Sequence, residues 1–359
     1  MSMEADPSAR RARFVRDLPK LELHAHLNGS IRRSTLLSLA ASHGIDPSSA
    51  QILTRWPSTL SEAFSVFTVI HSCVTTLSDV ERIAFEVGED MASDGVVYAE
   101  IRSTPRAMEG GSLDDYVRAV LRGFGRYRLT SGVEGVVLRL ILSIDRAKHT
   151  AADAQDIVDL ATAHRLAGVV GIDLSGDPTK GEFLTFLPAL QRARSLGLKI
   201  TLHAGEVANT DTEMSAMLDF HPDRFGHCCF VSDDNLKRLT QSRVPIELCL
   251  TSNLLSNSVG SAEEHHFGLH HANGTVCCIS TDDSGVFGSP LSNEFALVMD
   301  AFALDERQAF ELAKRTLEAV FLPTSDPGTE ATEEERRDWS VRQRVRAAFD
   351  AFHRTWDWE

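Results

Sequence analysis

Two histidines, His24 and His26, interrupt an otherwise largely apolar stretch at residues 21–30. Side chains alternate between the two faces of a β-strand, so a strand here would point both imidazoles in the same direction. Neutral imidazole is a good zinc ligand, and a stiff strand would hold the pair at a nearly fixed separation. The alternative is a pair of hydrogen-bonded core histidines. A metal site therefore requires further ligands elsewhere in the chain.

Such ligands follow other strand-like stretches. His203, His227 and Asp282 each lie at or near the carboxyl end of an apolar run. Three imidazoles and a carboxylate around one point leave an open position for water, as catalytic rather than structural zinc sites do. A lone histidine is usually a core residue, and Asp282 could cap a helix. Their joint placement nevertheless favours a metal centre.

Glu206 adds an acid to this group, because it lies three residues beyond His203 and past the flexible Gly205. Zinc lowers the pKa of water from near 16 to about 7, so hydroxide is available at neutral pH. An attacking hydroxide needs a proton donor on the substrate side, and an acid screened from solvent has a raised pKa that suits this role. The alternative for Glu206 is a capping acid at the start of the next helix.

The elements that would position these residues alternate regularly along the chain. The predicted strands are residues 21–30, 96–102, 136–145, 169–176, 199–206, 224–228, 245–253 and 275–283, with amphipathic helical stretches between them. Buried strands in such alternation indicate a parallel sheet, and eight units close into a (β/α)8 TIM barrel with extra helices. An open doubly wound sheet is the alternative. It is disfavoured because no Gly-x-Gly-x-x-Gly follows a strand and polar residues recur at strand ends.

The 359 residues fit one large domain, since such barrels absorb long insertions. We expect the barrel to span residues 18–322. Residues 1–17 are interpreted as an N-terminal extension that is free to be disordered. Residues 323–359 are interpreted as a loop and a charged helix packed on the barrel, with Trp356 and Trp358 as anchors.

Charge and composition limit the classes of binding partner that this protein can have. A net charge of −15 argues against nucleic-acid and anionic-membrane surfaces. The six cysteines form no Cys-x-x-Cys pair and are interpreted as reduced thiols. Residues 1–16 lack the apolar region of a secretory signal, and the most apolar run, residues 136–144, is too short to cross a bilayer. We expect a cytoplasmic, monomeric enzyme with a small-molecule substrate.

Five ordered motifs resemble the adenosine and AMP deaminase family, over residues 18–321. They are His24-Ala25-His26-Leu27, Gly171-Ile172-Asp173-Leu174-Ser175-Gly176-Asp177, His203-Ala204-Gly205-Glu206, Gly226-His227 and Ser280-Thr281-Asp282-Asp283. The branch looks like the adenosine deaminase-like proteins, which are N6-methyl-AMP deaminases. The resemblance implies a zinc (β/α)8 barrel, with one Zn²⁺ per chain, that removes the amine at purine C6 by hydrolysis.

The resemblance also implies roles, motif by motif. The zinc ligands would be His24, His26, His203 and Asp282, the last also counted as catalytic. Glu206 would protonate purine N1 as hydroxide attacks C6, and His227 would orient or deprotonate the water and stabilise the oxyanion. Gly176 would contact the purine edge through its backbone, and Asp283 would bind N7. Strict alternation would turn Asp283 away from Asp282, so the strand must end there for both roles to hold.

For this branch the resemblance implies a nucleotide site of His26, Asn28, His71, Ser103, Thr104, Pro105, Arg106 and Asp145. Arg106 and His71 would supply the local cations that an acidic protein needs for a 5′-phosphate. Asn28 stands where ordinary adenosine deaminases typically have Asp, whose charge would repel a phosphate. The alternatives are a solvated Arg106 and an Asn28 that touches nothing.

Three hypotheses follow. The first is hydrolysis of N6-methyl-AMP to IMP and methylamine, and the second is deamination of free adenosine to inosine and ammonia. The third is a metal-binding barrel without turnover, or a different barrel hydrolase. A binuclear hydrolase usually has a bridging Lys at the end of the fourth strand, where this chain has Leu174-Ser175-Gly176. The other zinc deaminase design is excluded because its Pro-Cys-x-x-Cys motif is absent.

Overall fold

A closed ring of parallel strands forms the centre of the molecule. The computed structural model describes residues 7–45, 60–132 and 135–358. Within them, eight strands pair in the order in which they occur: β1 (Lys20–His26), β2 (Val96–Ser103), β3 (Val137–Asp145), β4 (Val169–Ser175), β5 (Lys199–Ala204), β6 (Arg224–His227), β7 (Ile246–Leu248) and β8 (Cys277–Ile279). A parallel bridge between Ala25 and Asp282 joins the two ends of the sheet. The predicted (β/α)8 barrel is confirmed.

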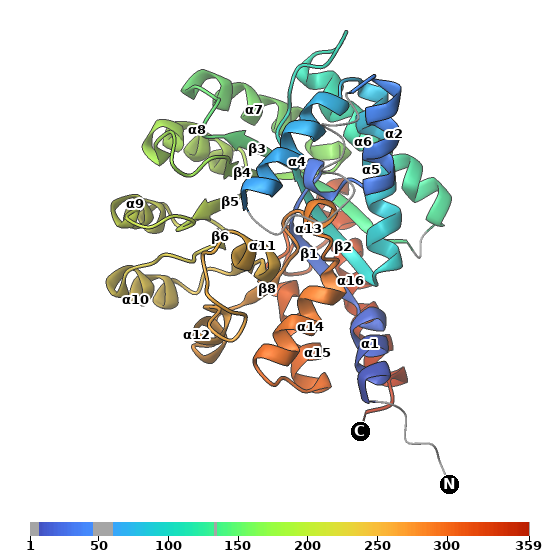
Figure 1. Cartoon of the computed structure of the whole chain (residues 1–359), viewed down its shortest axis with the longest axis vertical. Helices are drawn as coiled ribbons and strands as arrows, with labels where there is room; N and C mark the ends of the chain where they lie inside the picture. The colour runs from blue at the N-terminus through green and yellow to red at the C-terminus, as the bar shows by residue number, and fades with distance from the viewer. Residues whose placement is uncertain (1–6, 46–59, 133–134, 359) are drawn as a thin grey trace.

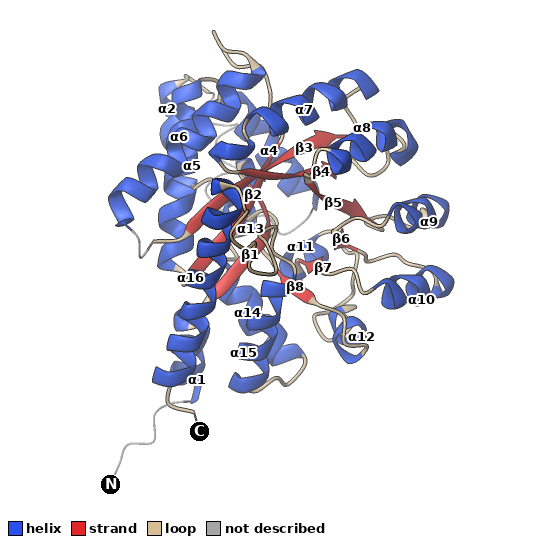
Figure 2. Ribbon diagram, turned by 180° about the vertical axis from the view of Figure 1, so that it is seen from behind, coloured by secondary structure: helices blue, strands red, loops and turns tan. Residues whose placement is uncertain are grey.

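Helices surround this barrel, as the two opposite views show (Figures 1 and 2). Those between successive strands are α2 (Arg33–Ser42), α4 (Leu60–Cys73), α5 (Leu77–Ser93), α6 (Leu113–Ser131), α7 (Ala151–Ala163), α8 (Phe183–Ser195), α9 (Asp211–Phe220), α10 (Asp233–Ser242), α11 (Leu250–Leu255) and α12 (Phe267–Ala272). After β8 come α13 (Ser284–Phe287), α14 (Leu291–Ala301), α15 (Glu306–Arg315) and α16 (Glu333–Thr355). Capping boxes begin α5, α6 and α7, each with an acid three residues after a Ser or Thr.

The strands form because both of their faces are buried. In β4, for example, Val169, Ile172 and Leu174 are each at most 1% exposed. Branched and aliphatic side chains of this kind fit a pleated surface that is covered by helices outside and by side chains within. None of the described helices has the length and apolarity needed to cross a bilayer.

The last two strands are shorter than the sequence pattern predicts. The expected strand at 245–253 ends at Leu248, and the chain turns into α11 at Leu250. The turn is stabilised by the buried Glu294, which accepts hydrogen bonds from the backbone N–H and hydroxyl of Thr251. β8 likewise ends at Ile279, and Asp282 adopts a left-handed φ of 59°. Tertiary contacts thus override the local strand propensity of these apolar runs.

Most of the N-terminal segment forms a helix. Residues Pro7–Asp17 form α1, while residues 1–6 lie outside the described part of the chain. Phe14 is fully buried, with its ring centroid 5.3 Å from that of Trp356 and 6.5 Å from that of Trp358. Burying a Phe side chain contributes about 1.5–3 kcal/mol, which accounts for the helix packing against the C-terminal segment.

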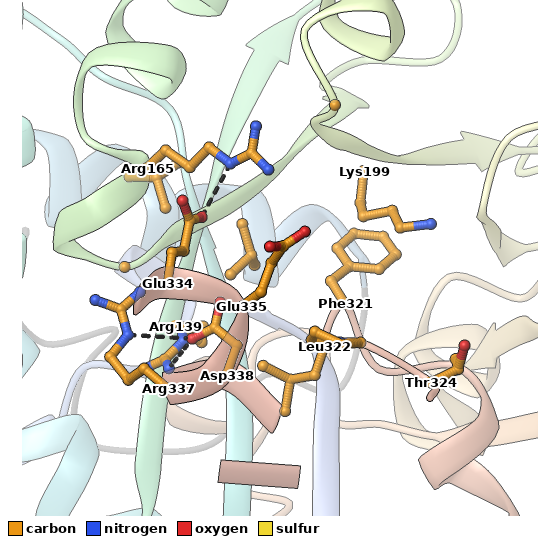
Figure 3. Close-up of a pocket in the computed structure, with 15 residues that line it drawn as sticks. Arg139, Arg165, Lys199, Phe321, Leu322, Thr324, Glu334, Glu335, Arg337 and Asp338 are labelled. Atoms are coloured by element: carbon orange, nitrogen blue, oxygen red, sulfur yellow. Dashed lines mark hydrogen bonds and ion pairs between the residues drawn. The ribbon is translucent and has the colours of Figure 1, made fainter. Parts of the chain in front are cut away.

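Ion pairs attach α16 to the amino-terminal end of the barrel strands (Figure 3). Arg165 bonds Glu334 at 3.0 Å, and the buried Arg139 bonds Asp338 at 2.9 Å. These side chains line a cavity of about 270 Å³ at the barrel end opposite to the one reached by His26 and Asp282. α16 therefore packs against the barrel at its amino-terminal end.

Candidate active site

Four predicted metal ligands meet at the carboxyl end of the barrel. Nε2 of His26 lies 3.3 Å from Nε2 of His203 and 3.3 Å from Oδ1 of Asp282. Nε2 of His24 lies 3.5 Å from the same Asp282 oxygen. Ligands about 2.0–2.2 Å from a tetrahedral zinc are separated by roughly this distance. The four side chains therefore have the spacing of a metal centre.

Carboxylates behind two of the histidines orient the ligand atoms towards that centre. Nδ1 of His24 donates to Oε2 of Glu247 at 2.6 Å, and Nδ1 of His203 donates to Oδ1 of Asp173 at 2.9 Å. A proton held on Nδ1 leaves the Nε2 lone pair free for a metal. Nε2 of His24 is buried and has no hydrogen-bond partner among the described residues. A metal would supply the missing partner, so the donor set fits one.

A buried ionic network supports these partners, and the sequence analysis missed it. Glu247 accepts from Arg102 at 2.7 Å and from Arg224 at 2.5 Å, and all three side chains are fully buried. Burial opposes ionisation of Glu247, but the two guanidinium groups hold its pKa well below the usual range. Glu247 therefore stays ionised. Its signal in the sequence was a charged residue in the middle of an apolar strand.

Glu206 faces the same region from the loop after β5. Gly205 adopts a left-handed φ of 58°, and an added Cβ there would lie 2.9 Å from the carbonyl oxygen of Phe230. The turn at Gly205 brings Oε2 of Glu206 to 3.7 Å from Nε2 of His227. Burial and then the charge of Asp282 raise the pKa of Glu206 to about 8. The carboxyl group is therefore protonated at neutral pH and can donate a proton.

His227 lies beside the ligands at the end of β6, with a left-handed φ of 60°. Its ring centroid is 4.8 Å from that of His24, and His24, His227 and Asp282 form a second potential ligand set that overlaps the first. Burial holds the pKa of His227 well below its ordinary value, so the ring is neutral. His227 is thus placed either to bind the metal or to contact a reactant beside it.

A cavity of about 730 Å³ adjoins this group. All ten predicted substrate-binding residues line it together with Glu206; they are His26, Asn28, His71, Ser103, Thr104, Pro105, Arg106, Asp145, Gly176 and Asp283. Phe67, Lys148, His149 and Lys180 also line it but were not predicted from the sequence, and so does Asp177, the last residue of the motif at 171–177. These residues come from loops and from α4, where no strand pattern marks their direction.

Asp283 reaches the cavity because β8 has already ended. Its Oδ1 is buried and has no hydrogen-bond partner among the described residues. A Cβ at Gly29 would lie 1.6 Å from this oxygen, so only glycine allows the approach. Burial and the neighbouring Asp282 raise the pKa of Asp283 well above its ordinary value. A protonated Asp283 can donate to an acceptor atom in the cavity.

One part of the cavity wall is basic. Nη2 of Arg106 donates to the carbonyl of Val74 at 2.6 Å, and its Nε is buried without a partner among the described residues. Lys148, by contrast, pairs with Asp145 at 2.8 Å. Burial and the charges of Arg106 and Lys148 lower the pKa of His71. Arg106 is therefore the cavity cation that no described carboxylate neutralises.

The side chain of Asn28 makes a specific contact in the cavity wall. It contacts the hydroxyl of Tyr116, which also lies 2.8 Å from the hydroxyl of Ser103. Tyr116 is 1% exposed. This shared contact fixes Asn28 and Ser103 on the same side of the cavity.

Comparison with known proteins gives a consistent assignment. Residues 19–329 match the adenosine deaminase family. The N6-mAMP deaminase of Arabidopsis thaliana is 42% identical over an alignment of 335 residues, which covers 86% of this chain and 94% of that protein. The N6-methyl-AMP deaminase of Bos taurus is 37% identical over 337 residues, 90% of this chain and 95% of that protein. The crystal structure of arabidopsis ADAL complexed with IMP aligns with a TM-score of 0.84 at 40% identity, covering 95% of this chain and 98% of that chain.

Proposed function

We propose that this chain, which belongs to the adenosine deaminase family of hydrolytic deaminases, converts N6-methyl-AMP and water into IMP and methylamine. Relatives at 37–42% identity over most of their length carry the name N6-methyl-AMP deaminase. An ADAL structure at 40% identity holds IMP, which would be the product of this reaction.

The observation that carries the substrate assignment is the unneutralised Arg106 in the cavity wall. The chain as a whole has a net charge of −15 and would repel a nucleotide. Arg106 gives a 5′-phosphate a local positive charge and charge-assisted donors. Lys148 is already paired with Asp145, and the lowered pKa of His71 leaves that ring neutral, so it offers a hydrogen bond rather than a charge. Asn28 adds an amide in place of a carboxylate, so no negative charge stands at that position.

We propose that one zinc ion is held by His24, His26, His203 and Asp282. The support is the facing Nε2 atoms, the orphaned Nε2 of His24 and the carboxylates behind the imidazoles. When bound, zinc would lower the pKa of water to about 7 and so provide a nucleophile at neutral pH. Burial lowers the pKa of His203 to about 4, so this ring is neutral and available as a ligand at pH 7.

The remaining groups act on the purine. A protonated Glu206 would donate its proton to N1, which makes C6 more electrophilic as the water oxygen adds. A protonated Asp283 would donate to N7 and fix the ring orientation. Gly176 would contact the purine edge through its backbone. The position requires glycine, because its φ is left-handed and an added Cβ would lie 2.4 Å from Oδ1 of Asp145. Each role depends on a group that lines the same cavity.

The test is to incubate the purified enzyme with N6-methyl-AMP, AMP, adenosine and adenine side by side. We expect IMP and methylamine from N6-methyl-AMP as the fastest reaction. Faster conversion of adenosine to inosine would replace this proposal by the nucleoside deaminase hypothesis. No turnover of any purine by zinc-loaded protein would favour a barrel without this activity. The cytoplasmic location and the monomeric state stay predictions from the sequence.

A further inference from the structure

A chain of three hydrogen bonds leads from a backbone N–H to His227. The N–H of Phe267 donates to Nδ1 of His265 at 3.0 Å. Nε2 of His265 lies 3.0 Å from Oδ1 of Asn253, and Nδ2 of Asn253 lies 3.3 Å from Nδ1 of His227. Asn253 and His265 are 3% and 2% exposed, so solvent does not compete for these contacts.

The backbone N–H sets the direction of every bond in this chain. A peptide N–H can only donate, so Nδ1 of His265 accepts and the proton of the neutral ring lies on Nε2. That proton is donated to the oxygen of the Asn253 amide. The amide nitrogen is then left to donate to His227, whose Nδ1 must accept. Burial lowers the pKa of His265 to about 2, which keeps this ring neutral.

We propose that Asn253 and His265 are positioning residues that hold His227 in the tautomer with its proton on Nε2. Nε2 of His227 is the atom that faces Glu206, at 3.7 Å, on the side of the metal ligands. A neutral imidazole protonated on Nε2 has no lone pair there. His227 therefore donates a hydrogen bond to the oxygen that adds to C6, and it is not the base that removes a proton from water.

The backbone at His227 is itself held in an unusual conformation. The carbonyl of His227 accepts a hydrogen bond from Nε2 of His266 at 2.6 Å. His227 and Cys228 both have left-handed φ angles, 60° and 57°. A non-glycine pair in this conformation costs free energy and persists only where surrounding contacts hold it. The donor role rests on the proposed deaminase function, whereas the tautomer itself is independent of it.

The direct test is an NMR measurement on full-length, zinc-loaded protein labelled with ¹⁵N-histidine. Long-range ¹H–¹⁵N spectra distinguish a protonated from an unprotonated ring nitrogen, and loss of the signal in His227→Gln assigns His227. We expect an unprotonated Nδ1 in the wild-type protein. Asn253→Asp keeps the side-chain size but can only accept when ionised, so the proton should move to Nδ1 of His227. A protonated Nδ1 in the wild type would overturn the proposal, and the measurement requires no turnover.

Kinetics then test whether the tautomer matters. The wrong tautomer in another enzyme's histidine site costs about 10⁴ in kcat, and we expect Asn253→Asp to lower kcat by about 10²–10⁴-fold with KM changed less than about threefold. In a His227→Gln background the same substitution should have no further effect. A similar loss in both backgrounds would instead identify a general charge effect and contradict the proposal. His270→Gln, a buried histidine of the same cluster outside the hydrogen-bond chain, is the matched control.

Discussion

Nδ1 of His24 and Oε2 of Glu247 lie 2.6 Å apart and are fully buried, although 223 residues separate them in the sequence. Arg102 and Arg224 keep Glu247 ionised, so the imidazole must donate from Nδ1 and present Nε2 to the metal. Glu247 on β7 thus determines which ring nitrogen of His24, on β1, is available to bind a metal.

The first prediction follows from this pair. Glu247→Gln removes the acceptor charge behind His24 and should weaken zinc binding about 10–100-fold, as loss of such partners typically does. Competition with a chelator measures the affinity. Glu100→Gln is the matched control, because Glu100 is also fully buried and paired with Arg224 but contacts no described histidine. Equal zinc affinity of Glu247→Gln and wild type would refute the orienting role.

The second prediction concerns the proton donor. Glu206→Gln keeps the shape of the side chain but removes the transferable proton, so kcat should fall by about 10²–10⁴-fold. Zinc content should remain at wild-type level, because Glu206 is not among the four proposed ligands. Elemental analysis and steady-state kinetics on the same sample separate the two effects. Near-normal turnover with zinc retained would remove Glu206 from the mechanism.

The third prediction is the pH dependence of the reaction. A general acid must be protonated, and the pKa of Glu206 is raised to about 8 by burial and the charge of Asp282. kcat/KM should therefore be maintained below this pKa and fall as pH rises through it. A bound cation favours the ionised carboxylate, so the falling limb should lie at or below pH about 8. Persistence of the same limb in Glu206→Gln would assign it to another group.

The barrel and the main site residues could be predicted from the sequence for a physical reason. Polar residues such as His24 and His203 stood out against apolar strands, and the ends of parallel strands meet at one edge. The pairing of His24 with Glu247 could not be predicted, because no local pattern links residues so far apart. Residues 249–253 read as the end of a strand by propensity, yet contacts of Thr251 with Glu294 turn the chain into α11 there. That turn also brings Asn253 to His227.

The fourth prediction tests the choice of Asn at position 28. Asn28→Asp places a carboxylate in the cavity wall and should depress kcat/KM for N6-methyl-AMP much more than for the nucleoside. One charge repulsion in a partly desolvated site is worth a few kcal/mol, or roughly tens to thousands of fold. Asn273→Asp serves as a control, since it adds the same charge at an exposed position outside this cavity. An equal decrease for nucleotide and nucleoside would show that Asn28 does not sense the phosphate.

The central claim is that the cavity selects a purine monophosphate, and comparing N6-methyl-AMP with N6-methyladenosine tests it most directly. The two molecules differ only in the 5′-phosphate that Arg106 would contact. Two charge-assisted hydrogen bonds contribute about 1.5–3 kcal/mol each, so kcat/KM should favour the nucleotide by at least about 100-fold. Arg106→Ala should remove most of this preference. A wild-type enzyme that deaminates the nucleoside as well as the nucleotide, or better, would contradict the account.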